Sequence, residues 1–387
     1  MTAIPIDKYV SSCEIVRGGS AYFEKYIRVI DECRETLFLV VYNFEDDATG
    51  RLVARALFRA RRRGVQVGVV LDGVGSMSFP DELRDRFLAE GIELRFFSKI
   101  YFKTRFRMGR RLHVKLLVAD KQTAVVGGIN IADRYRGLAN EEPWLDFGVF
   151  LKGDICKHLH EFAQRLMQRR KAKNKLRRIW ERAWSRQPGT EVRALVNDNF
   201  TRQFNIRASY KRRINTAKNT LIIFNSYFLP RYRLLRKLGN AVRRGVDVRL
   251  VLQGKSDVAV YPSAVKYYYH HLFAAGIKIY EYHKSVLHAK VATQDGRWCT
   301  VGSYNINDLS DILSVELNVE IEDPEVAGNF QHYLLDVIEN ECEPVNPGEY
   351  QNASRFTRFR WRMSYYFLLF MFRITYWLTC KEEDFVE

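Results

Sequence analysis

The chain has 387 residues, of which 47% are hydrophobic and 28% charged, a composition that excludes a disordered protein. Lysine and arginine number 62 against 45 acidic residues, giving a formal net charge of +17. We therefore expect a polyanionic partner, and nucleic acid and anionic lipid headgroups both qualify. Six scattered cysteines without a CxxC pair predict neither a zinc site nor a disulfide framework, so a reducing compartment is the default.

The chain repeats itself in two halves. The run TLFLVV at 36–41 corresponds to TLIIF at 220–224, and RGVQVGVVL at 63–71 corresponds to RGVDVRLVL at 244–252. Such β-rich runs alternate with helical segments, 50–63 in one half and 231–244 in the other. This alternation predicts an α/β fold with helices packed on a central sheet. We predict a first domain at 1–180, a second at 181–345 and a C-terminal tail at 346–387.

Each half contains the same polar motif with the same spacing. The members in the first half are His113, Lys115, Asp120, Gly127, Gly128 and Asn130, and those in the second half are His288, Lys290, Asp295, Gly302, Ser303 and Asn305. A histidine and a lysine two residues apart on a strand point to the same face. One such pair is weak evidence, because a lone histidine in an apolar strand is more often a buried residue with a satisfied hydrogen bond. Two copies with identical followers predict a functional site.

These residue types suit chemistry on a phosphodiester. A neutral imidazole can attack the phosphorus, and a second, protonated imidazole can donate to the departing alkoxide. Two lysines and two asparagine amides can stabilise the charge that accumulates on the phosphate oxygens. The sequence has no carboxylate cluster that would hold a metal, so we expect neither a metal nor another cofactor.

The sequence resembles the phospholipase D superfamily, whose signature HxK(x)4D(x)6G[GS]xN is matched in full by both halves. Within the superfamily it is similar to the bacterial cardiolipin synthase branch, over roughly residues 10 to 345. Further similar segments are EDD at 45–47, LDGVGS at 71–76, NSYFLP at 225–230 and QGKSD at 253–257. The resemblance implies two pseudo-symmetric α/β/α domains with mixed central sheets. It also implies one active site at their interface and a phosphohistidine intermediate.

The resemblance also assigns roles to residues. It makes His113 the nucleophile and His288 the acid–base partner. Phosphate binding falls to Lys115, Lys290, Asn130 and Asn305. The acids that follow each motif, Asp146 and Glu316, are expected to orient the opposite histidines, with surface ion pairs as the alternative.

The remaining motif positions are less tied to the reaction. Asp120 and Asp295 belong to the catalytic motifs, although the residues themselves favour a role in holding the turn after each strand. Two positions depart from the branch: Asn307 stands where similar synthases have aspartate, and Ser314 stands where they have asparagine. These departures bear on the choice of acceptor.

The C-terminal tail favours lipid over nucleic acid as the substrate. Four arginines (Arg355, Arg358, Arg360 and Arg362) precede an aromatic apolar stretch at 363–380 that Arg373 interrupts. This pattern predicts a basic aromatic helix lying in a membrane interface, and packing on the protein's own core is the alternative. The loop at 96–111 mixes aromatic and basic residues, which suits a membrane contact, a lid or a nucleic-acid grip. The basic segment at 164–187 suits a solvated helix face or a lipid-facing or partner-facing helix.

Taken together, these features predict a phosphatidyltransferase that makes cardiolipin from phosphatidylglycerol and a second phospholipid. Its expected partners are a membrane surface and anionic phospholipids, phosphatidylglycerol first and phosphatidylethanolamine as an alternative, without nucleic acid. We expect a peripheral location on the cytoplasmic face of the bacterial inner membrane. A hydrolytic phospholipase D, a nucleic-acid phosphodiesterase of the same superfamily and a non-enzymatic membrane scaffold are the competing interpretations.

Overall fold

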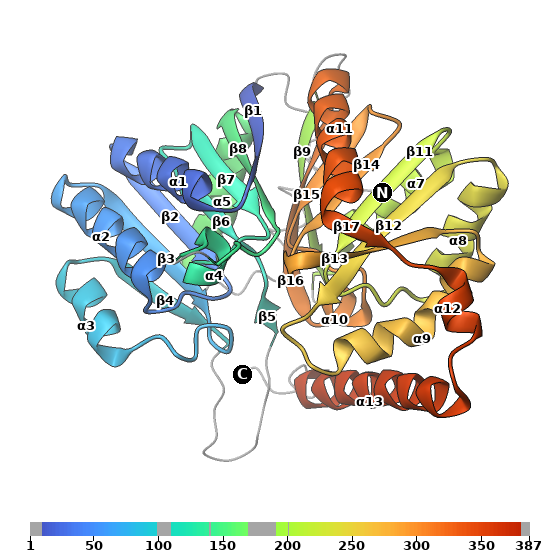
Figure 1. Cartoon of the computed structure of the whole chain (residues 1–387). Coiled ribbons are helices and arrows are strands. Elements are labelled where there is room, and N and C mark those ends of the chain that lie inside the picture. Colours follow the sequence, from blue (N-terminus) through green and yellow to red (C-terminus); the bar gives the residue numbers. More distant parts are fainter. Residues whose placement is uncertain (1–9, 99–109, 139–140, 169–190, 200, 381–387) are drawn as a thin grey trace.

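A computed structural model describes residues 10–98, 110–138, 141–168, 191–199 and 201–380. In Figure 1 each half of the chain contains a sheet that carries helices, and the two sheets face each other across the middle of the molecule. Most of the predicted loop at 96–111 and of the basic segment at 164–187 lies outside the described residues.

The first half contains a seven-stranded mixed sheet in the order β1-β8-β7-β6-β2-β3-β4. Its strands are β1 (Val10–Arg17), β2 (Thr36–Val41), β3 (Gln66–Asp72), β4 (Glu93–Phe97), β6 (Leu116–Ala119), β7 (Thr123–Gly127) and β8 (Phe147–Gly153). The β2-β3-β4 ladders are parallel and the others antiparallel. The helices are α1 (Ser20–Glu32), α2 (Ala48–Arg62), α3 (Asp81–Ala89), α4 (Asp133–Arg136) and α5 (Ile155–Met167).

The second half contains a mixed sheet in the order β10-β9-β16-β15-β14-β11-β12-β13-β17. Its strands are β9 (Glu191–Asp198), β10 (Gln203–Phe204), β11 (Thr220–Asn225), β12 (Asp247–Lys255), β13 (Lys278–Val286), β14 (Lys290–Gln294), β15 (Trp298–Gly302), β16 (Ser314–Glu322) and β17 (Cys342–Pro344). The helices are α7 (Asn205–Thr216), α8 (Tyr232–Arg243), α9 (Tyr261–Ala274), α10 (Asp308–Ile312), α11 (Pro324–Glu341), α12 (Pro347–Gln351) and α13 (Arg355–Cys380). Two mixed sheets with helices on them confirm the predicted fold class, and α2 and α8 occupy the predicted helical segments.

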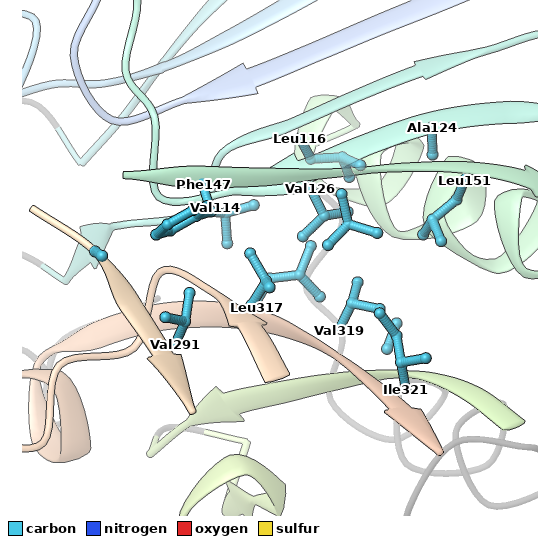
Figure 2. Close-up of a cluster of buried hydrophobic side chains, with 14 of the residues drawn as sticks. Val114, Leu116, Ala124, Val126, Phe147, Leu151, Val291, Leu317, Val319 and Ile321 are labelled. Atoms are coloured by element: carbon cyan, nitrogen blue, oxygen red, sulfur yellow. The ribbon is translucent and has the colours of Figure 1, made fainter. Parts of the chain in front are cut away.

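A shared apolar core joins the two halves. Side chains of β6, β7 and β8 in the first sheet meet side chains of β14 and β16 in the second, as Figure 2 shows for Val126, Leu151, Val291, Leu317 and Ile321. All five are fully buried or nearly so. Removing this much apolar surface from water strongly favours association of the two sheets, so the site between them has a rigid frame.

The chain also crosses between the halves. The short strand β5 (Arg111–Leu112) leaves the first half and pairs in parallel with the start of β16. The His113 amide then donates to the Val315 carbonyl over 3.0 Å. The mirror contact is a bridge between Leu145 and Leu287, in which the His288 amide donates to the Leu145 carbonyl over 2.8 Å. Each histidine is therefore held by backbone of the opposite half, one residue before an acidic residue.

Helix α13 packs on α9 along one face and leaves the other face exposed (Figure 1). Leu368 is buried against the second half, and Tyr365 and Phe372 pack on the same core. The exposed apolar face comprises Phe356, Phe359, Met363, Tyr366, Phe367 and Phe370. One face of α13 thus packs on the core, as the alternative interpretation expected. The other face is exposed and apolar, as expected of an amphipathic helix. No helix among the described residues combines the length and apolarity that crossing a bilayer demands.

Candidate active site

His113 lies between β5 and β6 and faces an acid of the second half. Its Nδ1 is 2.9 Å from Oε2 of Glu316, which is fully buried in β16. The Ser303 hydroxyl donates to the same carboxylate oxygen over 2.5 Å. The Tyr42 ring packs edge-on against the imidazole, with ring centroids 5.2 Å apart. With Nδ1 occupied by the carboxylate, Nε2 is the nitrogen left for a substrate.

His288 lies between β13 and β14 and faces an acid of the first half in the same way. Its Nδ1 is 2.6 Å from Oδ2 of Asp146, a buried residue just before β8. The rings of Tyr135 and Trp144 enclose the imidazole, with centroids 5.2 and 5.9 Å from its own. The structure therefore brings each histidine to the acid that follows the other motif.

The two lysines lie close enough to Asp146 and Glu316 to interact with both carboxylates. Lys115 donates to the His113 carbonyl over 2.8 Å, and Lys290 donates to the His288 carbonyl and lies 3.9 Å from Asp146. Burial and the neighbouring Lys290 lower the pKa of Lys115 to about 7. Burial likewise lowers the pKa of Lys290 to about 8, although Asp146 opposes this. A bound phosphate would raise both pKa values again, so the lysines form a site prepared for an anion.

The histidine–carboxylate pairs are tuned in the same low-dielectric environment. Burial lowers the pKa of His113, against the attraction of Glu316. Burial, with Lys290 next in effect, lowers the pKa of His288 well below its usual value. Burial raises the pKa of Asp146 to about 7. Because the pKa of Asp146 rises while that of His288 falls, the two groups share one proton and titrate as a coupled pair.

The two asparagines lie at equivalent places, three residues after the ends of β7 and β15. Asn130 donates to the Tyr135 hydroxyl over 2.9 Å, and its carbonyl accepts from the Asn43 amide. The side-chain oxygen of Asn305 accepts from the Ser226 hydroxyl over 2.8 Å. The side-chain NH₂ group of Asn305 takes no part in this hydrogen bond. Both side chains are held by the segment that follows β2 or β11, which are interior strands of the two sheets.

Asp120 and Asp295 lie elsewhere. Each follows the strand that begins after the histidine motif, so the whole strand separates it from the site. Asp120 accepts from the backbone amides of residues 34, 35 and 36, and Asp295 from those of residues 218, 219 and 220. Both have a positive φ, 51° and 53°. These contacts fasten the turn to the start of β2 or β11, which favours the turn-holding role.

Two residues to which the sequence assigned no role hold the segments that carry the histidines. Asp72, at the end of β3, accepts from the Leu112 amide over 2.7 Å and pairs with Arg111 at 3.1 Å. Gln253, at the equivalent position in β12, donates to the Leu287 carbonyl over 2.8 Å. Each therefore anchors the residue immediately before a histidine. Asp72 and Gln253 occupy equivalent positions in the repeat, directly after VVL and LVL, and this equivalence could have marked them as candidates. The spacing alone could not show which backbone group each one contacts.

Among the described residues, no group of three or more His, Cys, Asp or Glu side chains is placed to hold a metal ion. The chemistry available to the arrangement is that of two imidazoles, two buried cations and two carboxylates around one position for a phosphate.

The sequence matches a known protein family over most of both halves. Residues 26–166 and 210–337 match the domain family described as "Cardiolipin synthase, PLD-like domain". The chain belongs to this family. One matched stretch falls in each half of the chain, and together they include both histidine motifs.

Named relatives agree with this assignment. Cardiolipin synthase B of Shigella flexneri is 31% identical over 340 residues, which cover 86% of this chain and 82% of that protein. Cardiolipin synthase of Clostridium perfringens strain SM101 is 27% identical, with 88% of this chain and 73% of that protein covered. The protein is therefore an enzyme of the phospholipase D superfamily, and these relatives support a phospholipid phosphatidyltransferase.

A solved structure has the same fold. Phosphatidylserine synthase of Haemophilus influenzae Rd KW20 superposes with a TM-score of 0.72, covering 96% of this chain and 95% of its own. The sequence identity is 14%, so this likeness concerns the fold alone.

Proposed function

We propose that the enzyme transfers a phosphatidyl group from phosphatidylglycerol to the hydroxyl of a second phospholipid and so makes cardiolipin through a phosphohistidine. The observation that carries the proposal is the pair of histidines, each with Nδ1 on a buried carboxylate of the opposite half. Two rings fixed in this way present two Nε2 atoms to one phosphate, one for attack and one for proton transfer.

In the first step, Nε2 of neutral His113 attacks the phosphorus of phosphatidylglycerol. A P–N bond forms, the P–O bond to glycerol breaks, and His288 passes its proton to the glycerol oxygen. The Asp146–His288 pair can supply this proton because the raised pKa of Asp146 favours a proton shared between the two groups. Lys115, Lys290, Asn130 and Asn305 are proposed to bind the phosphate oxygens as their charge grows.

The second step reverses the roles. His288 accepts a proton from the hydroxyl of the acceptor lipid, whose oxygen attacks the phosphorus while the P–N bond breaks. His113 is released as the neutral imidazole, and the product is cardiolipin. If water took the place of the acceptor, the product would be phosphatidic acid, so the exclusion of water decides between transfer and hydrolysis.

We further propose that α13 holds the enzyme on a membrane surface, which we assign to the cytoplasmic face of the inner membrane. Large apolar side chains recur on its exposed face at spacings of three and four residues, and Phe356 is 75% exposed. Arg355, Arg358 and Arg362 on the same helix suit anionic headgroups. Replacing Phe359 and Phe367 with serine should release the enzyme from phosphatidylglycerol vesicles in a sedimentation assay. The same change at Met77 and Leu88, exposed residues of the first half, should not.

The proposed reaction can be tested by following products from phosphatidylglycerol vesicles by mass spectrometry, with and without phosphatidylethanolamine. We expect cardiolipin and free glycerol in equal amounts, and neither product from the His113→Ala or His288→Ala variant. Phosphatidic acid without cardiolipin would identify a hydrolase. Cleavage of DNA without lipid turnover would overturn the proposal.

A further inference from the structure

A cavity lies beneath the middle of α13 in the second half. Its volume is about 460 Å³, within the range of small-molecule sites. The walls are largely apolar and include Leu229, Ile312, Leu313, Tyr365, Leu369 and Phe372. They come from the loop after β11, from α10 and its end, and from the inner face of α13. The proposed reaction assigns no role to this cavity.

Backbone contacts connect the cavity walls directly to the active site. The amide of Leu229 donates to the carbonyl of Ile306, the residue after Asn305, over 2.9 Å. The carbonyl of Leu313 accepts from the amide of Arg111, two residues before His113, over 2.9 Å. The cavity walls are therefore fixed to the segments that carry Asn305 and His113.

The opposite side of the cavity reaches the surface at α13. Arg373 lines the cavity and is exposed, and Arg231, also exposed, forms an ion pair with Asp308 at another part of the wall. The exposed apolar face of α13 lies on the same helix as the cavity-lining Tyr365 and Leu369. A helix that presents apolar side chains outward and roofs an apolar cavity inward connects a lipid surface with the catalytic residues.

We propose that this cavity binds an acyl chain of the donor phospholipid while its phosphate lies between His113 and His288. The inference rests on the proposed function and deepens it by assigning the lipid tail a place. An acyl chain fits because the walls are apolar and the cations lie where the cavity meets the surface. Binding energy from the chain, remote from the reacting phosphorus, would then position the phosphate for attack.

The cavity can be filled or enlarged at one position. Leu369→Trp should fill part of it, and Leu369→Ala should enlarge it. Leu88→Trp is the matched control, because Leu88 is an exposed leucine on helix α3 of the first half. Each variant would be assayed in mixed micelles with dipalmitoyl and with dihexanoyl phosphatidylglycerol, after vesicle sedimentation shows that membrane binding is retained.

We expect Leu369→Trp to lower kcat/KM for the long-chain donor by roughly tenfold or more and to leave the short-chain donor nearly unchanged. Leu369→Ala should retain the long-chain activity, and Leu88→Trp should behave as the unaltered enzyme. Equal losses with both donors, or the same loss in Leu369→Ala, would assign Leu369 to helix packing and overturn the proposal.

A binding measurement separates this inference from the proposed reaction. Phosphatidylglycerol with a photoreactive diazirine at the end of one acyl chain would be cross-linked to the full chain, and the sites mapped by mass spectrometry. We expect labels on Ile312, Tyr365 or Leu369, reduced in Leu369→Trp. Such labels without any lipid turnover would sustain the cavity while refuting the proposed reaction. Labels confined to the exposed face of α13 would refute the cavity as a chain-binding site.

Discussion

The two halves of the site have the same backbone plan but different immediate surroundings. In one, His113 faces the longer acid Glu316, which also accepts from Ser303. In the other, His288 faces the shorter Asp146, and the position equivalent to Ser303 is Gly128. A Cβ atom at Gly128 would come within 2.3 Å of Asp146 Oδ2, so glycine is what admits the shorter acid. The repeat thus conserves position while the contacts of each carboxylate differ.

The surroundings of the histidines differ in the same direction. The His113 side chain is 16% exposed and has one aromatic neighbour, Tyr42, whereas that of His288 is 7% exposed and lies against Tyr135 and Trp144. The more accessible ring suits attack on a lipid phosphorus. The more enclosed ring, with a carboxyl whose pKa is about 7, suits a proton donor. The two copies of the motif thus differ in their neighbours in a way that suits different roles in the proposed reaction.

Removing either ring should have the largest effect. His113→Ala and His288→Ala should each lower kcat with phosphatidylglycerol on the order of 10⁴-fold, because neither half-reaction proceeds without both groups. Cardiolipin formation measured by mass spectrometry checks this. If one variant kept near-normal transfer, the two motifs would not form a single site.

Replacing Asp146 or Glu316 with its amide should change the pH profile of kcat/KM in different ways. The pKa of Asp146, about 7, places the alkaline fall of kcat/KM just above neutrality, where the pair with His288 loses its proton. Asp146→Asn should lower activity roughly 10³-fold and move this fall to lower pH, because the imidazolium loses its carboxylate.

Glu316→Gln provides the contrasting pH profile. His113 must be neutral to attack, so activity falls at acid pH as His113 becomes protonated. Because Glu316 raises the pKa of His113, its loss should lower this pKa further and move the acid limb of the profile to lower pH. The alkaline limb should stay in place. If both variants moved the same limb, the assignment of acid and nucleophile would be wrong.

The glycine–serine difference should be visible in a matched pair of alanine variants. Gly128→Ala should displace Asp146 from His288 and lower kcat roughly 10²-fold, since small misplacements of catalytic groups are costly. Ser303→Ala removes one hydrogen bond to Glu316 and should cost about tenfold. Steady-state kinetics decide the order. A larger effect at Ser303 would contradict the close-packing argument.

Burial of the two lysines should lower the stability of the folded protein near neutral pH. The pKa of Lys115 is about 7 in the folded protein against 10.5 ordinarily, so the folded state binds fewer protons than the unfolded state between these values. Stability therefore rises with pH across this window, and the cost of burying Lys115 is fully present below pH about 7.

Lys115→Met should thus raise Tm near neutral pH, by roughly 2–4 °C for each kcal/mol relieved, with the gain vanishing as pH approaches 10.5. Lys290→Met should gain less, because its pKa is lowered less and it lies near Asp146. Calorimetry without lipid measures both. A gain that grew with pH would reverse the sign of the argument.

The fold class and the membership of the site were largely accessible from the sequence, because the repeat and motif spacing are local patterns. The resemblance also led to the expected contact between His113 and Glu316, which are 203 residues apart. The pairing of β5 with β16 that makes this contact was not accessible, because only the folded chain sets its register. The anchoring contacts of Asp72 and Gln253, and the close approach of Gly128 to Asp146, depend on the same register. The cavity under α13 depends on how a helix that reads as amphipathic docks on α9, which periodicity does not specify.

The most direct test of the division of labour is to trap the covalent intermediate. A phosphatidyl donor with a p-nitrophenol leaving group needs no proton from an acid, so His288→Ala should still complete the first step and then stall without its base. After rapid quenching, peptide mapping should place the phosphatidyl group on His113 in His288→Ala and find none in His113→Ala. The opposite result would be an adduct on His288 in the His113→Ala variant and no adduct on His113 in the His288→Ala variant. It would show that the roles of the two histidines are the reverse of those proposed.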